Sequence, residues 1–395
     1  AGETGVKKLL TERLAIYPDY AINGENWLDE TIRPQVLRLR DSEGFVRADS
    51  WSPGMEIVLP EITTFCSSIS KFGISKEIER LLGKPKTDRK WSELEIERLL
   101  CARGADFEAV CIAADDLRKK VNGDIITYAV NRNINYTNIC TFRCGFCAFS
   151  KGKMSDNLRG KPYNLNMVEI VRRTKEAWQR GATEVCLQGG IHPNYTGQTY
   201  LDICKELKTA VPEIHIHAFS PLEVWQGAKT LGMTVAEFLH QLRDAGLDTL
   251  PGTAAEVLDD EVRKIICPDK LTTEQWLSVM RDAHHEGFKT TATLMHGHVE
   301  KPRHVARHFI KLLELQSQTG GFTEFVPLPY VHMETPIFLK GKARKGPTFR
   351  EAVLVHAVAR LVLHPYFTNI QTSWVKMGPE GIKTCLNSGA NDLGG

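Results

Sequence analysis

The chain has little net charge, no long uninterrupted apolar run and no disulfide pattern. Its 50 basic and 48 acidic residues give a formal charge of +2, so nothing suggests a nucleic-acid partner. The most apolar stretch, residues 351–367, is interrupted by His356, Arg360 and His364, which predicts a core-facing amphipathic helix and no membrane span. Ten irregularly spaced cysteines argue against a disulfide scaffold and indicate a reducing compartment. We therefore expect a cytoplasmic protein. An organelle is the alternative, because a targeting segment would precede Ala1 and so lie outside the given sequence.

Three segments of the chain differ in pattern. Residues 1–60 alternate short helical patterns with breaks rich in Pro, Gly and Asp, which favours a linker or the tail of a preceding domain. Residues 61–122 contain two amphipathic patterns separated at Gly104, so we expect a helical cap there. Residues 123–395 form the main domain. The chain starts with Ala1 and stops without a tail, and we therefore expect a segment of a longer protein.

The main domain repeats one rhythm, in which a short apolar or β-branched run is followed by a loop and a helical pattern. The spacing leaves room for one crossover helix after each run, which is typical of parallel βα units. We predict an α/β fold of the (β/α)8 barrel type, with an open doubly wound sheet as the alternative. Active residues of such a barrel lie at the carboxyl ends of the strands. The predicted strands are residues 133–138, 183–188, 213–219, 247–250, 288–295, 323–328 and 367–374, and an eighth begins near residue 390.

Three cysteines, Cys140, Cys144 and Cys147, follow the first predicted strand within eight residues. Three soft ligands on one loop are one short of the closed tetrahedral site that a structural zinc ion prefers. A ferredoxin-type cluster also uses four thiolates. Three thiolates on a 4Fe-4S cluster would leave one iron open to a substrate or cofactor.

The loop with its x3, x2 spacing, and with Phe146 directly before the last cysteine, resembles the cluster loop of the radical S-adenosylmethionine (SAM) enzymes. In that superfamily the open iron binds the amino and carboxylate groups of SAM, and an electron from the cluster cleaves SAM to a 5′-deoxyadenosyl radical. The resemblance implies a 4Fe-4S cluster and SAM as cofactors. It also implies SAM contacts from Phe146, Gln188, Gly189, Gly190 and Ser220.

Polar residues follow the other predicted strands. The Gly pair of QGGIHP lets a ligand approach the backbone closely, and a plain βα turn is the alternative. Ser220 and Glu223 are expected at the rim of the barrel. Thr253 with Glu256 has the capping-box pattern of a helix start. Other polar residues near the strand ends have two interpretations. They could be ligands, acids, bases or hydrogen-bonding groups of a site, or they could belong to the core or to a polar rim. These residues are His215, His217, His296, His298, Glu300, His304, Gln371, Ser373 and Trp374.

Six motifs in order, INYTNICTFRCGFCAF, QGGIHP, HAFSPLEV, PGTAAEVL, GHVE and IQTSWVKMG, resemble the second, tyrosine-using component of FO synthase. The resemblance implies a transferase that breaks the Cα–Cβ bond of L-tyrosine. It would join the 4-hydroxybenzyl group to 5-amino-6-(D-ribitylamino)uracil in the biosynthesis of the deazaflavin FO. The residues implied on the substrate side are Glu256, His298, Glu300, Gln371 and Ser373.

The related aminofutalosine synthase and futalosine cyclase share the cluster loop and are the alternative within this class. A non-catalytic iron-sulfur or zinc-binding protein is the alternative of another class. The implied partners are an electron donor such as ferredoxin or flavodoxin and the first FO synthase component, to whose end residues 1–55 are similar. The family more often has Tyr in place of His296, and it continues past Gly395 through the last strand and helix, so we expect a truncated barrel. The loop at residues 150–163 is expected to be a lid.

Overall fold

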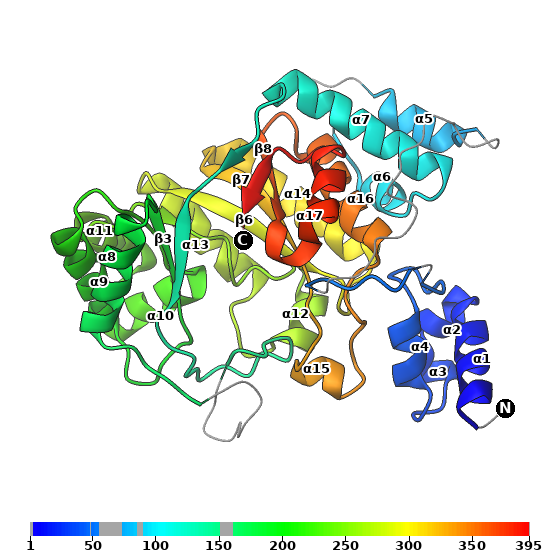
Figure 1. Cartoon of the computed structure of the whole chain (residues 1–395), viewed down its shortest axis with the longest axis horizontal. Helices are drawn as coiled ribbons and strands as arrows, with labels where there is room; N and C mark the ends of the chain where they lie inside the picture. The colour runs from blue at the N-terminus through cyan, green and yellow to red at the C-terminus, as the bar shows by residue number, and fades with distance from the viewer. Residues whose placement is uncertain (1–2, 48, 55–72, 85–89, 151–160, 395) are drawn as a thin grey trace.

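The computed structural model describes residues 3–47, 49–54, 73–84, 90–150 and 161–394 (Figure 1). These residues form a nine-stranded sheet in the order β1-β9-β8-β7-β6-β5-β4-β3-β2. Every neighbouring pair is parallel. The strands are β1 Thr127–Tyr128, β2 Asn131–Asn135, β3 Glu184–Gln188, β4 His215–His217, β5 Thr249–Leu250, β6 Lys289–His296, β7 Phe322–Pro329, β8 Asn369–Ser373 and β9 Asp392–Gly394.

One short stretch of chain supplies both ends of this strand order. β1 and β2 are separated by only two residues, yet Thr127 pairs with Asp392 of β9 and Asn131 pairs with Glu184 of β3. The sheet therefore curls, so that the first and last strands of the order, β1 and β2, lie next to each other in the chain within residues 127–135. The predicted barrel-type α/β fold is confirmed, the first predicted strand is divided in two, and the strand expected near residue 390 is β9.

Helices follow the strands as the pattern predicts. Local caps fix the helix ends: Asn166 accepts a hydrogen bond from the Glu169 amide at 2.9 Å, and Gly320 ends its helix in the left-handed region with φ 60°. Figure 1 shows α8 to α11 grouped on one side of the sheet and α5 to α7 beyond α16 on another. The helices of the main domain are α8 Met167–Gln179, α9 Gly197–Ala210, α10 Pro221–Leu231, α11 Val235–Asp244, α12 Asp260–Ile266, α13 Thr273–His285, α14 Pro302–Thr319, α15 Pro336–Leu339, α16 Phe349–Leu363 and α17 Trp374–Leu386.

The predicted helix start at Thr253 and Glu256 is wrong. The chain begins α12 only at Asp260, with Asp259 as the N-cap residue. The intervening backbone is already engaged, because the Leu258 amide donates to Nδ1 of His308 at 3.0 Å. The Glu256 side chain, with a backbone φ of 49°, is therefore free of the capping role that the sequence pattern assigned to it.

The apolar helix expected to be amphipathic is α16, and it is buried on all sides. It packs against β8 and against two helices of the cap, α6 Glu93–Leu100 and α7 Ala105–Asn122. Its polar residues find partners inside the protein: Arg360 donates to the Gly389 and Thr368 carbonyl oxygens. The helical cap is present as α6, α7 and α5 Lys76–Leu82. Its expected start near residue 61 lies outside the described residues, as do residues 151–160 of the expected lid.

The N-terminal region is four short helices, α1 Glu3–Ala15, α2 Pro18–Ile22, α3 Gly24–Trp27 and α4 Arg33–Leu39, with a small core of their own. The stretch that follows them is fastened to the main domain. Arg47 donates to the carbonyl oxygens of Gly346 and Pro347 at 2.8 and 2.9 Å, and buried Trp51 packs edge-on against Phe349, with ring centroids 5.4 Å apart. Residues 41–54 are therefore part of the barrel's packing. None of the described helices is long and apolar enough to cross a membrane.

This packing predicts the effect of removing Trp51. Replacing a fully buried Trp by Ala should lower the free energy of unfolding of the whole chain by about 3–5 kcal/mol, measured by urea denaturation. Trp27, which is 62% exposed, is the matched control, and Trp27→Ala should change stability little. Equal effects of the two substitutions would show that residues 41–54 do not stabilise the barrel.

Candidate active site

The three clustered cysteines line one cavity of about 280 Å³ at the carboxyl end of β2 and β3. All three are partly buried. Backbone amides point at two of the sulfur atoms: Ile191 N donates to Sγ of Cys140 and Ser150 N to Sγ of Cys147, each at 3.3 Å. Hydrogen bonds to sulfur are one of the means by which proteins tune iron-sulfur clusters.

The protonation of these thiols depends on a counter-charge. Burial raises the pKa of Cys144 and Cys147, and Lys270 acts in the opposite direction on both. Thiolate ligands buried in this way need a cationic partner, which a metal cluster supplies. The donor set, three thiols on one cavity with amide donors beside them, fits a cluster that takes three ligands from the chain.

The Gly pair after β3 is required by close packing against the cysteine loop. A Cβ on Gly190 would stand 2.8 Å from the carbonyl carbon of Ile139 and 2.9 Å from Cβ of Cys140. A Cβ on Gly189 would overlap the ring of Tyr136. The sequence suggested that the glycines admit a ligand. In the structure both glycines line the cavity, but the volume that a Cβ atom would fill at each position is occupied by Tyr136, Ile139 and Cys140.

Glu223 lines this cavity as a buried residue, whereas the sequence suggested a place at the rim. Its carboxylate accepts hydrogen bonds from the amides of Gly189 at 3.1 Å and Ser220 at 2.7 Å, from the Ser220 hydroxyl and from the Tyr136 hydroxyl. Burial outweighs these donors and raises the pKa of Glu223. The residue ties together the segments that follow β2, β3 and β4. The hydroxyl of Ser220, a predicted cofactor contact that lines the cavity, is bonded to Glu223.

Lys270 is a cavity residue that sequence reasoning missed. Its ammonium group lies 2.7 Å from Oε1 of Glu256 and 5.2 Å from the ring centre of Phe146. The Lys270 and Glu256 side chains are only 10% and 14% exposed. Burial acts to lower the pKa of Lys270, but Glu256 and the neighbouring thiols outweigh it and raise the pKa. Lys270 lies in the turn after α12, where no sequence pattern marks it.

His298 and Glu300, expected on the substrate side, line neither this cavity nor the interior of the barrel. Both are buried behind the end of β6, where Nε2 of His298 hydrogen-bonds the Met295 carbonyl oxygen at 3.0 Å. Glu300 accepts from the amide of Gly297 at 2.6 Å and from Arg344 at 2.9 Å. These bonds turn the GHVE segment inward. Met295, which they hold, does line the cavity.

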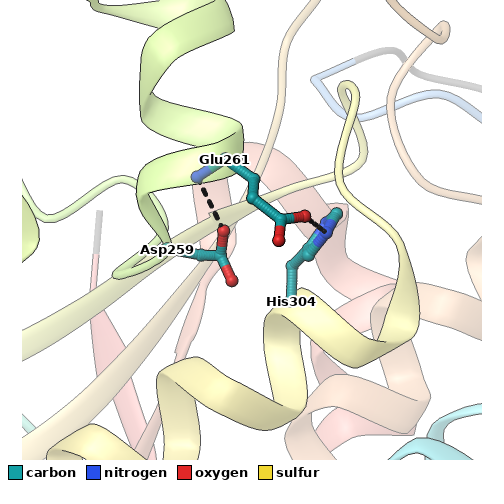
Figure 2. A group of neighbouring side chains, drawn as sticks. All are labelled: Asp259, Glu261 and His304. Atoms are coloured by element: carbon teal, nitrogen blue, oxygen red, sulfur yellow. Dashed lines mark hydrogen bonds and ion pairs between the residues drawn. The ribbon is translucent and has the colours of Figure 1, made fainter.

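A second group of possible metal ligands lies at the start of α12 and α14 (Figure 2). Within the described ranges, one group of three possible ligands has donor atoms that all lie within 4.8 Å of one another: Asp259, Glu261 and His304. Arg307 already pairs with both carboxylates, at 3.2 and 3.4 Å. His304 is also engaged: its Nδ1 accepts from the Lys301 amide at 3.0 Å, and its Nε2 lies 3.3 Å both from Nε of Arg303 and from Glu261. We interpret this group as an ion-pair cluster.

The interior of the barrel is a second, larger cavity of about 640 Å³. Gln371 and Ser373, two of the predicted substrate-side residues, line it. The Gln371 amide donates to Glu324 at 3.1 Å and to Asp392 at 2.8 Å. Within the described part of the chain, the buried Ser373 hydroxyl has no hydrogen-bond partner. Four residues line both cavities and so connect them: Gln188, Thr253, Thr293 and Leu328.

Glu324 and Asp392 lie close enough to influence each other's protonation. Burial and, next, the neighbouring Asp392 raise the pKa of Glu324 to about 9. Two carboxyl groups in one partly dry site cannot both ionise cheaply. Near neutral pH the pair therefore holds one proton, which makes it a hydrogen-bond donor as well as an acceptor.

Comparisons with known proteins agree with this arrangement. Residues 134–312 match the sequence model of the Radical SAM superfamily, and residues 319–395 match that of the CofH/MqnC C-terminal region. FO synthase of Streptomyces avermitilis is 42% identical over 98% of this chain and 49% of its own length. The chain thus spans about half the length of such relatives.

A relative of similar length is also found. The 5-amino-6-(D-ribitylamino)uracil–L-tyrosine 4-hydroxyphenyl transferase of Methanothermobacter thermautotrophicus is 46% identical over 75% of this chain and 80% of its own. Among solved structures, methylornithine synthase superposes with a TM-score of 0.59 at 18% identity, covering 80% of this chain and 85% of its own. The hydrogenase maturase HydG of Carboxydothermus hydrogenoformans gives 0.61 at 15%, with 80% and 70% covered. These two show the fold alone.

The packing of Gly190 predicts that Gly190→Ala displaces the cysteine loop, since overpacking of this kind costs about 1–3 kcal/mol. After anaerobic reconstitution we expect the iron content per chain to fall well below that of the unmodified protein, while the circular dichroism spectrum is kept. Gly73, where a Cβ meets no atom within 4 Å, is the control site for the same substitution. Full iron loading of Gly190→Ala would contradict the packing argument.

The carboxyl pair predicts a pH-dependent stability. Because the folded chain keeps the Glu324 proton up to about pH 9 and the unfolded chain releases it near the ordinary value of 4.5, this contribution to stability is fully present below pH 4.5 and is lost as the pH rises toward 9. Between pH 5 and 9 the free energy of unfolding should fall more in the unmodified protein than in Glu324→Gln, by more than about 1 kcal/mol. Urea denaturation at each pH measures this. Glu206→Gln, on the exposed face of α9, should follow the unmodified protein.

Proposed function

The chain belongs to the radical SAM family that contains the FO synthases and the 5-amino-6-(D-ribitylamino)uracil–L-tyrosine 4-hydroxyphenyl transferase, and we propose that it joins the 4-hydroxybenzyl group of L-tyrosine to 5-amino-6-(D-ribitylamino)uracil. The observation that carries the proposal is the cavity formed by the three cysteines, Gly189 and Gly190 in a chain that matches most of the length of the named transferase.

Cys140, Cys144 and Cys147 would hold the 4Fe-4S cluster. The residues proposed around SAM are Phe146, Gln188, Gly189, Gly190 and Ser220, all of which line the same cavity. When bound, the cluster and SAM supply one electron and a 5′-deoxyadenosyl radical that removes a hydrogen atom from the tyrosine amino group. The apolar side chains of Phe142, Ile191, Leu222 and Met295 also line the cavity and would exclude water from that chemistry.

The remaining steps balance in atoms and electrons. Tyrosine without its amino hydrogen breaks the Cα–Cβ bond, and the amino-acid remainder leaves as 2-iminoacetate. The 4-hydroxybenzyl fragment forms a carbon–carbon bond to the uracil ring. The adduct would then lose one proton and return one electron to the redox partner that supplied the first, so that the reaction consumes no net electron.

The chain's own residues have distinct proposed roles. Lys270, beside Glu256 in the cavity of the cysteines, supplies the positive charge that a substrate carboxylate requires. Glu256 orients that ammonium group. Gln371 and Ser373 offer hydrogen bonds from the barrel interior. His298 and Glu300 act as positioning residues, because they hold the end of β6 from behind.

The reaction needs a one-electron donor, and a ferredoxin or flavodoxin is the proposed class. The first component of FO synthase is the proposed partner that consumes the product, as the fused relatives suggest. Residues 41–54 are packed on the barrel by Arg47 and Trp51, so the region before them would stay close to the site in a longer chain.

The test is anaerobic reconstitution followed by product analysis. We expect about four irons per chain, 5′-deoxyadenosine on addition of SAM and a reductant, and a coupled product by mass spectrometry when tyrosine and the diaminouracil are both present. Cys144→Ala should abolish all three, and Cys101→Ala, at the end of α6, should abolish none. Zinc in place of iron, an intact cluster that never cleaves SAM, or product only with a futalosine-pathway substrate would each overturn the proposal.

A further inference from the structure

The interior of the barrel is open and polar where barrels of this type are normally filled. A (β/α)8 core is usually packed by layers of Val, Ile and Leu side chains. Here the lining is rich in carboxyl, amide, hydroxyl and imidazole groups, and burying such groups without partners is costly. A cavity of about 640 Å³ is within the size range of small-molecule sites, about 300–1,000 Å³. The interior therefore has the size and chemistry of a ligand site.

The charge of this interior restricts what can bind. Carboxyl groups come from Glu184, Glu324 and Asp392, whereas the described residues that line the interior include no Arg or Lys. Burial lowers the pKa of His217 to about 4, so that ring adds no positive charge near neutral pH. A ligand with its own carboxylate would meet these three carboxyl groups and, among the described lining residues, no Lys or Arg. An uncharged ligand with many N–H and O–H groups would find acceptors.

The hydrogen-bonding groups form a connected array on one side of the interior. Gln371 bridges Glu324 and Asp392, and Asp392 also accepts from the Thr127 hydroxyl at 2.5 Å. Ser373 is 1% exposed, and its hydroxyl, which has no hydrogen-bond partner among the described residues, is available to a ligand. On the opposite strands, His215 and His217 both contact the Thr249 hydroxyl at 2.7 Å. Donors and acceptors thus face the same space from several strands.

We propose that this interior is the binding site of the pyrimidine acceptor, with Glu324, Gln371 and Asp392 recognising its amino and polyol groups. The inference rests on the proposed function, which requires two substrates of different character. The ribitylamino-substituted uracil carries no carboxylate and many donors, whereas tyrosine carries a carboxylate, and among the described residues that line the two cavities the only Lys or Arg is Lys270, in the cavity of the cysteines. Gln188, Thr253, Thr293 and Leu328 line both spaces, so an acceptor bound in the interior reaches the place where the tyrosine fragment is released.

The test is to measure the Kd of each substrate for the reconstituted protein in separate experiments. Equilibrium dialysis under anaerobic conditions gives both values. The variants are Glu324→Gln, which keeps the shape of the side chain, and Gln371→Leu, which removes the bridge between the two carboxyl groups. Leaving a buried polar group of the ligand or of the array without its hydrogen-bond partner should raise the Kd for 5-amino-6-(D-ribitylamino)uracil about 10- to 100-fold. The Kd for L-tyrosine should change less than about threefold. Glu206→Gln is the surface control, and thermal melting shows that each variant is folded.

Two results would overturn the inference. If the tyrosine Kd rises and the acceptor Kd does not, the interior binds the amino acid. If neither Kd changes in folded variants, the polar groups serve only the structure. Failure of the proposed function looks different: the unmodified protein would bind the acceptor more tightly than the variants and yet form no coupled product.

Discussion

The parallel pairing of residues 127–135 with both β9 and β3 is the constraint on which the rest of the molecule depends. Because every neighbouring pair of strands is parallel, all strands present their carboxyl ends at the same opening. The same stretch then runs directly into the cysteine loop, so closure of the sheet also places the three cysteines at that opening. Glu223 secures the arrangement, since it hydrogen-bonds groups that follow three neighbouring strands. Ligand placement and fold are thus consequences of one connection.

Two connected cavities of opposite character result from this geometry. The cavity beside the cysteines is lined largely by apolar side chains and contains one buried cation, Lys270. The barrel interior is polar and, among its described lining residues, has no cationic Lys or Arg. A radical reaction between an amino acid and an uncharged polar acceptor needs both environments, one to exclude water and compensate a carboxylate and one to hold a polyol. Under the proposed function, the contrast in charge would place the amino acid beside Lys270 and the acceptor in the barrel interior.

Much of the fold was predictable because parallel βα units leave strong local signals. Every predicted strand overlaps an observed one, and the caps at Asn166 and Gly320 form as their side chains and backbone conformations require. Errors arose where tertiary contacts outweigh a local pattern. The Thr253 and Glu256 pattern begins no helix because the Leu258 amide bonds His308 instead. His298 and Glu300 stand behind the site because Arg344, 44 residues beyond Glu300 in the chain, draws the carboxylate inward.

The sequence by itself determined the clustering of the three cysteines, the parallel βα order and the family, because cysteine spacing and strand spacing are local properties of the chain. Only the tertiary structure decided that Lys270 faces Phe146 and Glu256, that Glu223 is buried, and that Glu324, Gln371 and Asp392 share one interior. These residues come from different strands and turns, and their proximity follows from the curvature of the closed sheet. No local sequence pattern encodes that curvature, so the charge and polarity of the two cavities follow only from the tertiary structure.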